Sequence, residues 1–170
     1  MEQIGYDMYC ELLDQVVKEL KGEEIIEEVD VQIDLDVTSY IPEDYIENSS
    51  QKIEVYQNIA LCKNEEDIQN ITDEVIDRYG MMPYEVENLL DVARIKILAR
   101  EKYILKIAQK NENIIFYFDS SKFNFEIVDK LMKTFRNRIK FSPSQNPYIT
   151  FKISDMKKIL EESKDFLVKL

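Results

Sequence analysis

Carboxylates are the most abundant side chains in this sequence that could do chemistry, because 34 of its 170 residues are Asp or Glu. Two carboxylates can act as general acid and base, but the spacing here singles out no such pair. One regular pattern is present: Asn70, Asp73, Glu74 and Asp77 recur at i, i+3, i+4 and i+7. On a helix of about 3.6 residues per turn these four positions share one face, which we call the acidic ridge.

The acidic ridge has two interpretations. An acidic face on a rigid helix can contact a positively charged partner and set the register of a complex. Alternatively, Glu74 pairs with Arg78 at spacing i+4 and the other side chains form a solvated face. The residues alone leave both interpretations open.

Side chains for other kinds of site are scarce. The sequence has no histidine, so Ser/His/Asp and Cys/His arrangements are excluded. Cys10 and Cys62 form no CxxC pair, and we expect two buried or idle thiols. The three glycines cannot form a Walker loop or a GxGxxG fingerprint. We therefore expect no enzyme activity, no cofactor and no bound metal.

Composition and length are those of one compact globular domain, with 45% hydrophobic residues and a net charge of −12. The charge is uneven: residues 1–91 hold 25 acids and 5 bases, whereas residues 92–170 hold 9 acids and 17 bases. We expect a helical acidic part over about 1–102 and a β/α basic part over about 103–170. The sequence lacks a membrane span and a signal peptide, so a cytoplasmic location is expected.

The first half is predicted to be helical with one strand. Strict alternation predicts that strand over Val29–Val37, with three acids on its polar face. A helix carries Tyr6 to Leu20, with Gly22 as its C-cap, and Pro42 opens a short helix. The next helix is capped by Ser49 or Ser50, with these residues inward: Ile53, Tyr56, Ile59 and Ala60.

The helix that carries the acidic ridge is predicted to begin after Asn64, with three acids in its first turn, and to end at Gly80. Pro83 should occupy the first position of the following helix, which has two apolar stripes and packs on two sides. The core stripe of the ridge helix lies opposite the ridge and contains Ile68, Ile71, Val75 and Tyr79.

The second half predicts an α+β arrangement, with two hairpin-like strand pairs packed with helices. The strands are expected over 104–108 and 113–118, joined by a loop at 109–112, and over 139–142 and 148–153. One helix is expected over 124–137, with Ile127, Val128, Leu131, Met132 and Phe135 inward. Asp155 should cap a last helix with Met156, Ile159, Leu160, Phe166 and Leu167 inward.

One dense basic cluster lies in the span Lys130–Lys140 and contains Lys130, Lys133, Arg136, Arg138 and Lys140. Binding of single-stranded nucleic acid combines basic residues with aromatic side chains on which bases stack. No aromatic platform is interleaved with this cluster, and the net charge is negative. We therefore expect no direct contact with nucleic acid, and whether the cluster binds anything stays open.

Three passages resemble the C-terminal domain of the transcription-repair coupling factor (Mfd) family. The most specific is Glu74-Val-Ile-Asp-Arg-Tyr-Gly-Met-Met-Pro, which continues into residues 86–96. The others are residues 4–13 and residues 40–46 with the helix after them. Tyr79 stands where phenylalanine is usual in the family, and Gln57 with Asn58 occupies positions that are commonly basic. The resemblance is specific over residues 4 to about 100.

The resemblance implies a regulatory module of a large ATP-driven DNA translocase that displaces stalled RNA polymerase and recruits UvrA for nucleotide-excision repair. This module would dock on the UvrB-like N-terminal module of the same protein and mask the surface that UvrA binds. It would have no ATPase activity, because the motor lies N-terminal to it. The candidate interface residues are Glu74 and Asp77, flanked by Asp73 and Asn70.

Two other classes of function remain. A stand-alone acidic adaptor, or a DNA mimic, would compete with duplex DNA for a basic partner. A small hydrolase with paired carboxylates would need a pocket that contains strongly perturbed acids.

Overall fold

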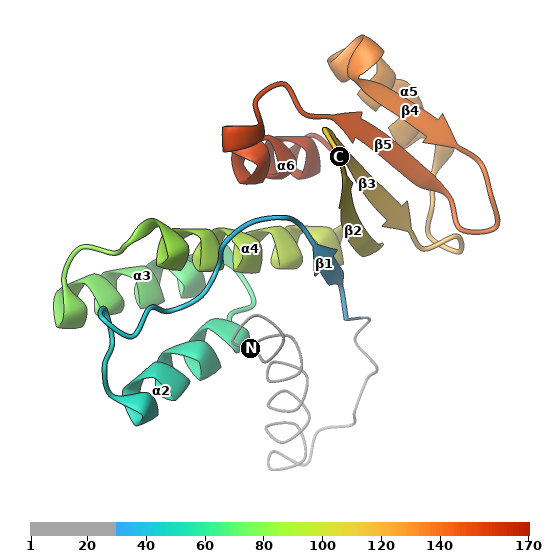
Figure 1. Cartoon of the computed structure of the whole chain (residues 1–170). Coiled ribbons are helices and arrows are strands. Elements are labelled where there is room, and N and C mark those ends of the chain that lie inside the picture. The colour runs from blue at the N-terminus through green and yellow to red at the C-terminus, as the bar shows by residue number, and fades with distance from the viewer. Residues whose placement is uncertain (1–29) are drawn as a thin grey trace, which may run out of the picture. The chain divides into compact units, whose positions relative to one another are not determined.

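Figure 1 shows the computed structural model, which describes residues 30–170. These residues form two compact units, one of residues 37–94 and one of residues 30–36 together with 95–170. A single helix, α4 (Tyr84–Glu101), contributes to both units. The prediction of one domain over 1–170 stays a prediction. The helix expected from Tyr6 to Leu20 lies outside the described residues, as does Cys10.

The second unit contains a five-stranded mixed sheet in the order β1-β2-β3-β5-β4. Antiparallel neighbours pair within β2-β3, β3-β5 and β5-β4, whereas β1 runs parallel to β2. The predicted α+β fold is therefore confirmed, and the first strand joins the sheet as an edge. The strand bounds are β1 Gln32–Asp34, β2 Ile104–Lys110, β3 Asn113–Phe118, β4 Ile139–Ser142 and β5 Tyr148–Lys152.

β1 is shorter than the strand predicted over Val29–Val37, so the predicted length of this strand was wrong. Beyond Asp34 the ladder with β2 stops, and the Asp36 backbone N–H donates to the Gln109 side-chain oxygen at 2.8 Å. The alternation itself is real, because inward and outward residues continue to alternate up to Val37. Side-chain periodicity therefore extends further than backbone pairing.

The segment before α2 (Ser49–Ala60) corrects three predictions. The helix expected from Pro42 through Ile46 is a single hydrogen-bonded turn, because only the Tyr45 and Ile46 N–H groups donate back, both to the Pro42 carbonyl. Asn48 caps α2 in place of the two serines, since its side-chain oxygen accepts from the Gln51 N–H at 3.0 Å. Val55 is buried, whereas Ile53 is 47% exposed, so the inward stripe of α2 is rotated from the predicted one.

α3 (Glu65–Tyr79) begins and ends where the sequence predicts. Asn64 accepts a hydrogen bond from the Asp67 N–H at 2.9 Å, and Gly80 takes a φ of 87° that favours glycine. α4 follows after a short turn and has buried residues on two sides, as expected. Pro83 lies just before the helix instead of at its first position, and its carbonyl accepts from the Glu87 N–H.

Aromatic side chains form the centre of the second unit. Phe116 of β3 stacks on Phe166 at 4.2 Å between ring centroids, and Phe151 of β5 lies 5.0 Å from both Phe135 and Phe166. These contacts place α5 and α6 on the same face of the sheet (Figure 1). The helix bounds are α5 Phe125–Phe135 and α6 Ile159–Val168, each next to a short 3-10 turn, η1 Arg136–Arg138 and η2 Met156–Lys158.

Three details of the second half differ from the prediction. Met132 and Met156 are exposed and not inward, and Met156 lies in the 3-10 turn η2 before α6. The hairpin between β2 and β3 uses a two-residue turn in place of a four-residue loop, because Asn111 adopts a positive φ of 56°. Asp155 caps the 3-10 turn that leads into α6, accepting from the Lys157 N–H at 3.0 Å.

Glu162 anchors α6 to the end of β5. Its carboxylate accepts from the Ser154 hydroxyl, from the backbone N–H groups of Ser154 and Asp155, and from Arg138 at 2.6 Å. Burial alone would raise the pKa of Glu162, but these hydrogen bonds together lower it. The Arg138 guanidinium also lies 4.6 Å from the centre of the Phe151 ring. This network fixes the helix that supplies Phe166.

Candidate protein-interaction surface

The acidic ridge lies on the exposed side of α3. Its residues Asn70, Asp73, Glu74 and Asp77 are all exposed, while Ile68 and Val75 on the opposite side are buried. The two-faced helix predicted from the sequence is therefore present. Whether the ridge is an interface is not decided by exposure, and that assignment stays a prediction.

The carboxylates of the acidic ridge make few hydrogen bonds or ion pairs with other residues in 30–170. Glu74 meets Arg78 at 3.4 Å with half of its side chain exposed, which is a long and solvated ion pair. Asp73 accepts from the Gln69 side chain at 2.9 Å. Asp77 makes no side-chain hydrogen bond or ion pair with a residue in 30–170. The carboxylates are thus largely available to a partner.

The first turn of α3 is attached to α4 within the first unit. Arg94 donates to both carboxylate oxygens of Glu65, at 2.8 and 3.0 Å, and to Asp91 at 3.1 Å. Glu65 therefore has a partner on α4 in addition to its place in the first turn of α3. Both bonds to Glu65 come from the single Nε–H group of Arg94, so the contact is a bifurcated, charge-assisted hydrogen bond, and it holds the start of the ridge helix.

The other end of α3 is held by two tyrosines. The Tyr45 hydroxyl donates to the Gly80 carbonyl at 2.7 Å, and the Tyr45 and Tyr79 ring centroids lie 6.1 Å apart. Burial, followed by the charge of Tyr79, raises the pKa of Tyr45. The Tyr79 hydroxyl is buried and has no hydrogen-bond partner among the described residues.

Sequence reasoning missed apolar side chains around the ridge. Ile76 is 44% exposed, and Met81, just after the end of α3, is 92% exposed. Tyr84 at the start of α4 is also exposed. The exposure of Ile76 could have been predicted from the sequence. At about 100° per residue, Ile76 lies roughly 95° around the helix from the centre of the core stripe, and so outside it. Large exposed apolar residues beside charges are typical of contact surfaces.

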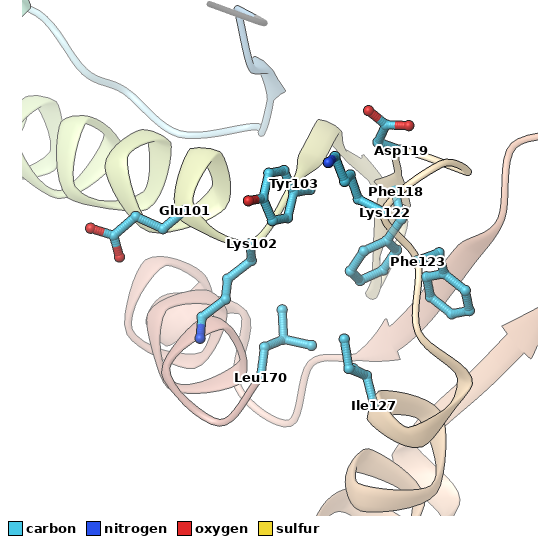
Figure 2. Close-up of a pocket in the computed structure, with 9 residues that line it drawn as sticks. All are labelled: Glu101, Lys102, Tyr103, Phe118, Asp119, Lys122, Phe123, Ile127 and Leu170. Carbon is cyan, nitrogen blue, oxygen red and sulfur yellow. The ribbon is translucent and has the colours of Figure 1, made fainter.

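Figure 2 shows a pocket of about 230 Å³ in the second unit. Phe118, Phe123 and Ile127 form its apolar side, and Asp119 is at its rim. Hydrogen bonds from the Ser121 hydroxyl and N–H lower the pKa of Asp119. A lowered carboxyl pKa favours the charged form, whereas a general acid requires a raised one. Asp119 is therefore not the raised-pKa acid that the hydrolase hypothesis requires.

No group of three or more Cys, Asp or Glu side chains within residues 30–170 is arranged to hold a metal ion. Cys62 is buried, and burial together with the charge of Asp67 raises the pKa of its thiol to about 12. The prediction of a buried thiol is confirmed for Cys62. No helix in the described part of the chain is long and apolar enough to cross a membrane.

The predicted basic cluster spans three consecutive elements, α5, η1 and β4. Arg138 is used by Glu162 and Phe151, and Lys133 pairs with Asp129 at 3.6 Å on the exposed side of α5. Lys140 lies on β4, and Lys130 is exposed on α5. Arg138 is therefore engaged within the fold, and whether the other four residues bind a partner stays a prediction to be tested.

Comparison with known proteins identifies the family. The TRCF domain family matches residues 35–128. The transcription-repair-coupling factor of Rickettsia typhi is 30% identical over 172 residues, covering 98% of this chain and 15% of that protein. The Bacillus subtilis protein of the same name is 34% identical over 115 residues, covering 67% of this chain and 10% of that protein. The chain thus spans a small part of these relatives.

A solved structure has the same fold. The crystal structure of the C-terminal domain of a transcription-repair coupling factor superposes with a TM-score of 0.75 at 21% identity. The match covers 82% of this chain and 91% of that one. This chain therefore belongs to the TRCF domain family of transcription-repair-coupling factors, as its sequence motifs predicted, and has the fold of their C-terminal domain.

Proposed function

We propose that this chain is a non-catalytic regulatory module that docks on the UvrB-like N-terminal module of its own full-length protein. Docking would mask the surface that UvrA binds, and release would expose it for recruitment of nucleotide-excision repair in the cytoplasm. RNA polymerase would be contacted by other parts of the protein. The observation that carries the proposal is the exposed acidic ridge on a helix fixed at both ends.

The ridge suits a basic partner surface. Its three carboxylates point away from the core, and the one ion pair at Glu74 is too exposed to compete strongly with an interface. Ile76 and Met81 supply apolar area beside the charges. An interface of this kind combines buried apolar anchors with charge pairs that set orientation.

The test is titration calorimetry of the 170-residue chain against the isolated UvrB-like module. Glu74→Lys combined with Asp77→Lys should leave the circular dichroism spectrum unchanged and weaken docking about tenfold or more at low salt. Glu47→Lys combined with Glu54→Lys changes the net charge equally on exposed positions before and within α2 and should leave docking intact. Equal affinities of the wild type and the ridge variant would contradict the assignment.

Duplex DNA serves as competitor in the same titration. A DNA mimic or acidic adaptor would lose its partner to duplex DNA, and it would also bind basic proteins other than the UvrB-like module. Docking that resists duplex DNA and depends on the ridge supports the regulatory role. Complete competition by duplex DNA favours the mimic.

A further inference from the structure

One face of the sheet is left uncovered by α5 and α6. Residues of β3 alternate between faces, so Phe116 and Phe118 point to the helices while Ile115 and Tyr117 point the other way. On β5 the buried Ile149 and Phe151 alternate in the same manner with Tyr148, Thr150 and Lys152. We call the side opposite α5 and α6 the open sheet face.

Two tyrosines lie side by side on the open sheet face. Tyr117 of β3 pairs directly with Tyr148 of β5, and their ring centroids are 5.4 Å apart. In the same row across the sheet, Lys106 of β2 pairs with Tyr117, and its ammonium lies 6.0 Å from the ring centre. Paired strands are about 4.8 Å apart, so these three side chains form one continuous surface.

Further lysines surround the tyrosine pair. Lys140 of β4 lies one row away, paired with Thr150, and Lys110 and Lys152 lie one row beyond, on either side of Asn113. None of the four lysines makes an ion pair with a residue of the described chain. Strands β2 to β5 place no acid on this face, and only the edge strand β1 contributes one, Asp34. The open sheet face is therefore locally basic on a protein of net charge −12.

We propose that the open sheet face binds single-stranded nucleic acid, with bases stacking on Tyr117 and Tyr148 and phosphates contacting the lysines. Aromatic side chains stack on any base, and lysines neutralise the backbone, so the combination binds single strands with little sequence preference. A flat sheet face presents no helix that could enter the major groove of a duplex. An acidic peptide could form ion pairs with the lysines, but it has no bases to stack on the two adjacent tyrosine rings. The tyrosines therefore favour nucleic acid as the ligand.

This proposal departs from the sequence prediction of no direct contact with nucleic acid. That prediction relied on the lack of an aromatic platform interleaved with the cluster at Lys130–Lys140 and on the negative net charge. The tyrosines and most of these lysines come from other strands, and only strand pairing brings them together.

The experiment is fluorescence anisotropy of a labelled oligothymidylate titrated with the 170-residue chain at low salt. We expect weak, saturable binding, tighter than to a duplex of the same length. Tyr117→Ala with Tyr148→Ala should weaken binding about tenfold or more, whereas the two Tyr→Phe substitutions, which keep the rings, should not. Lys106→Gln, Lys140→Gln and Lys152→Gln together should reduce the slope of log K against log salt by about 2.

The control removes three exposed lysines elsewhere in the same unit, Lys130, Lys157 and Lys158, each changed to Gln. It should leave affinity and slope close to those of the wild type. Equal loss in the control and sheet-face variants would show unspecific attraction and overturn the proposal. Affinity for poly-glutamate equal to that for the oligothymidylate, with no effect of the tyrosine substitutions, would assign the face to an acidic protein instead. Circular dichroism of each variant excludes unfolding as the cause.

Discussion

The Tyr45 hydroxyl donates a 2.7 Å hydrogen bond to the carbonyl of Gly80, the residue that ends the ridge helix. Gly80 has a φ of 87°, a conformation that only glycine adopts readily. The contact joins the turn after Pro42 to the C-terminal end of α3 within the first unit. It therefore holds the C-terminal end of the helix that carries the acidic ridge, next to the exposed Met81.

Removal of the hydroxyl group should lower stability at Tyr45 but not at Tyr79. Tyr45→Phe leaves the Gly80 carbonyl without its donor and should lower the free energy of unfolding by about 0.5–1.5 kcal/mol. Tyr79→Phe removes a buried hydroxyl that has no partner among the described residues and should leave stability unchanged or raise it by about 1 kcal/mol. Urea unfolding measures both values. An equal loss for both variants would mean that the Tyr79 hydroxyl is hydrogen-bonded in solution.

Glu162 should make stability depend on pH. The pKa of its carboxyl is lowered in the folded chain, so the stabilisation is complete above the ordinary carboxyl value of about 4.3 and is lost as pH falls through the lower folded value. Glu162→Gln should lower the free energy of unfolding at neutral pH by about 1–3 kcal/mol, because Arg138 and three donors lose a charged acceptor.

The matched control for Glu162 is its exposed neighbour on α6, Glu161. Glu161→Gln should change stability little at any pH. In urea unfolding followed across acidic pH, the gap between Glu162→Gln and wild type should narrow below about pH 4. A gap that stays constant would show that the carboxylate charge contributes nothing.

Cys62 should be almost unreactive in the folded chain. With a thiol pKa of about 12, only about one Cys62 thiol in 10⁴ is ionised to the thiolate near pH 8. In a Cys10→Ser background, a disulfide reagent should react slowly with the native chain and at once with the chain in denaturant. Rapid reaction of the native chain would indicate that α2 and the start of α3 open readily.

Elements governed by local interactions could be predicted from the sequence. Asn64 and Gly80 mark the ends of α3 because a side-chain cap and a positive φ each act within a few residues. The capping residue of α2 was misplaced by one or two positions, since Asn48 and the two serines have similar capping preferences and only the extended backbone at Asn48 decides between them. Ile53 and Val55 show the same limit for burial: propensity and spacing permit either stripe.

The acidic and apolar faces of α3 can be predicted from residue order alone, because helical periodicity fixes both faces within one element. The same holds for the strand alternation that directs Tyr117 and Tyr148 away from the buried phenylalanines. The position of β5 between β3 and β4, which makes these tyrosines neighbours, is visible only in the folded chain. Strand order and register depend on contacts between residues far apart in the chain, and no local preference encodes them.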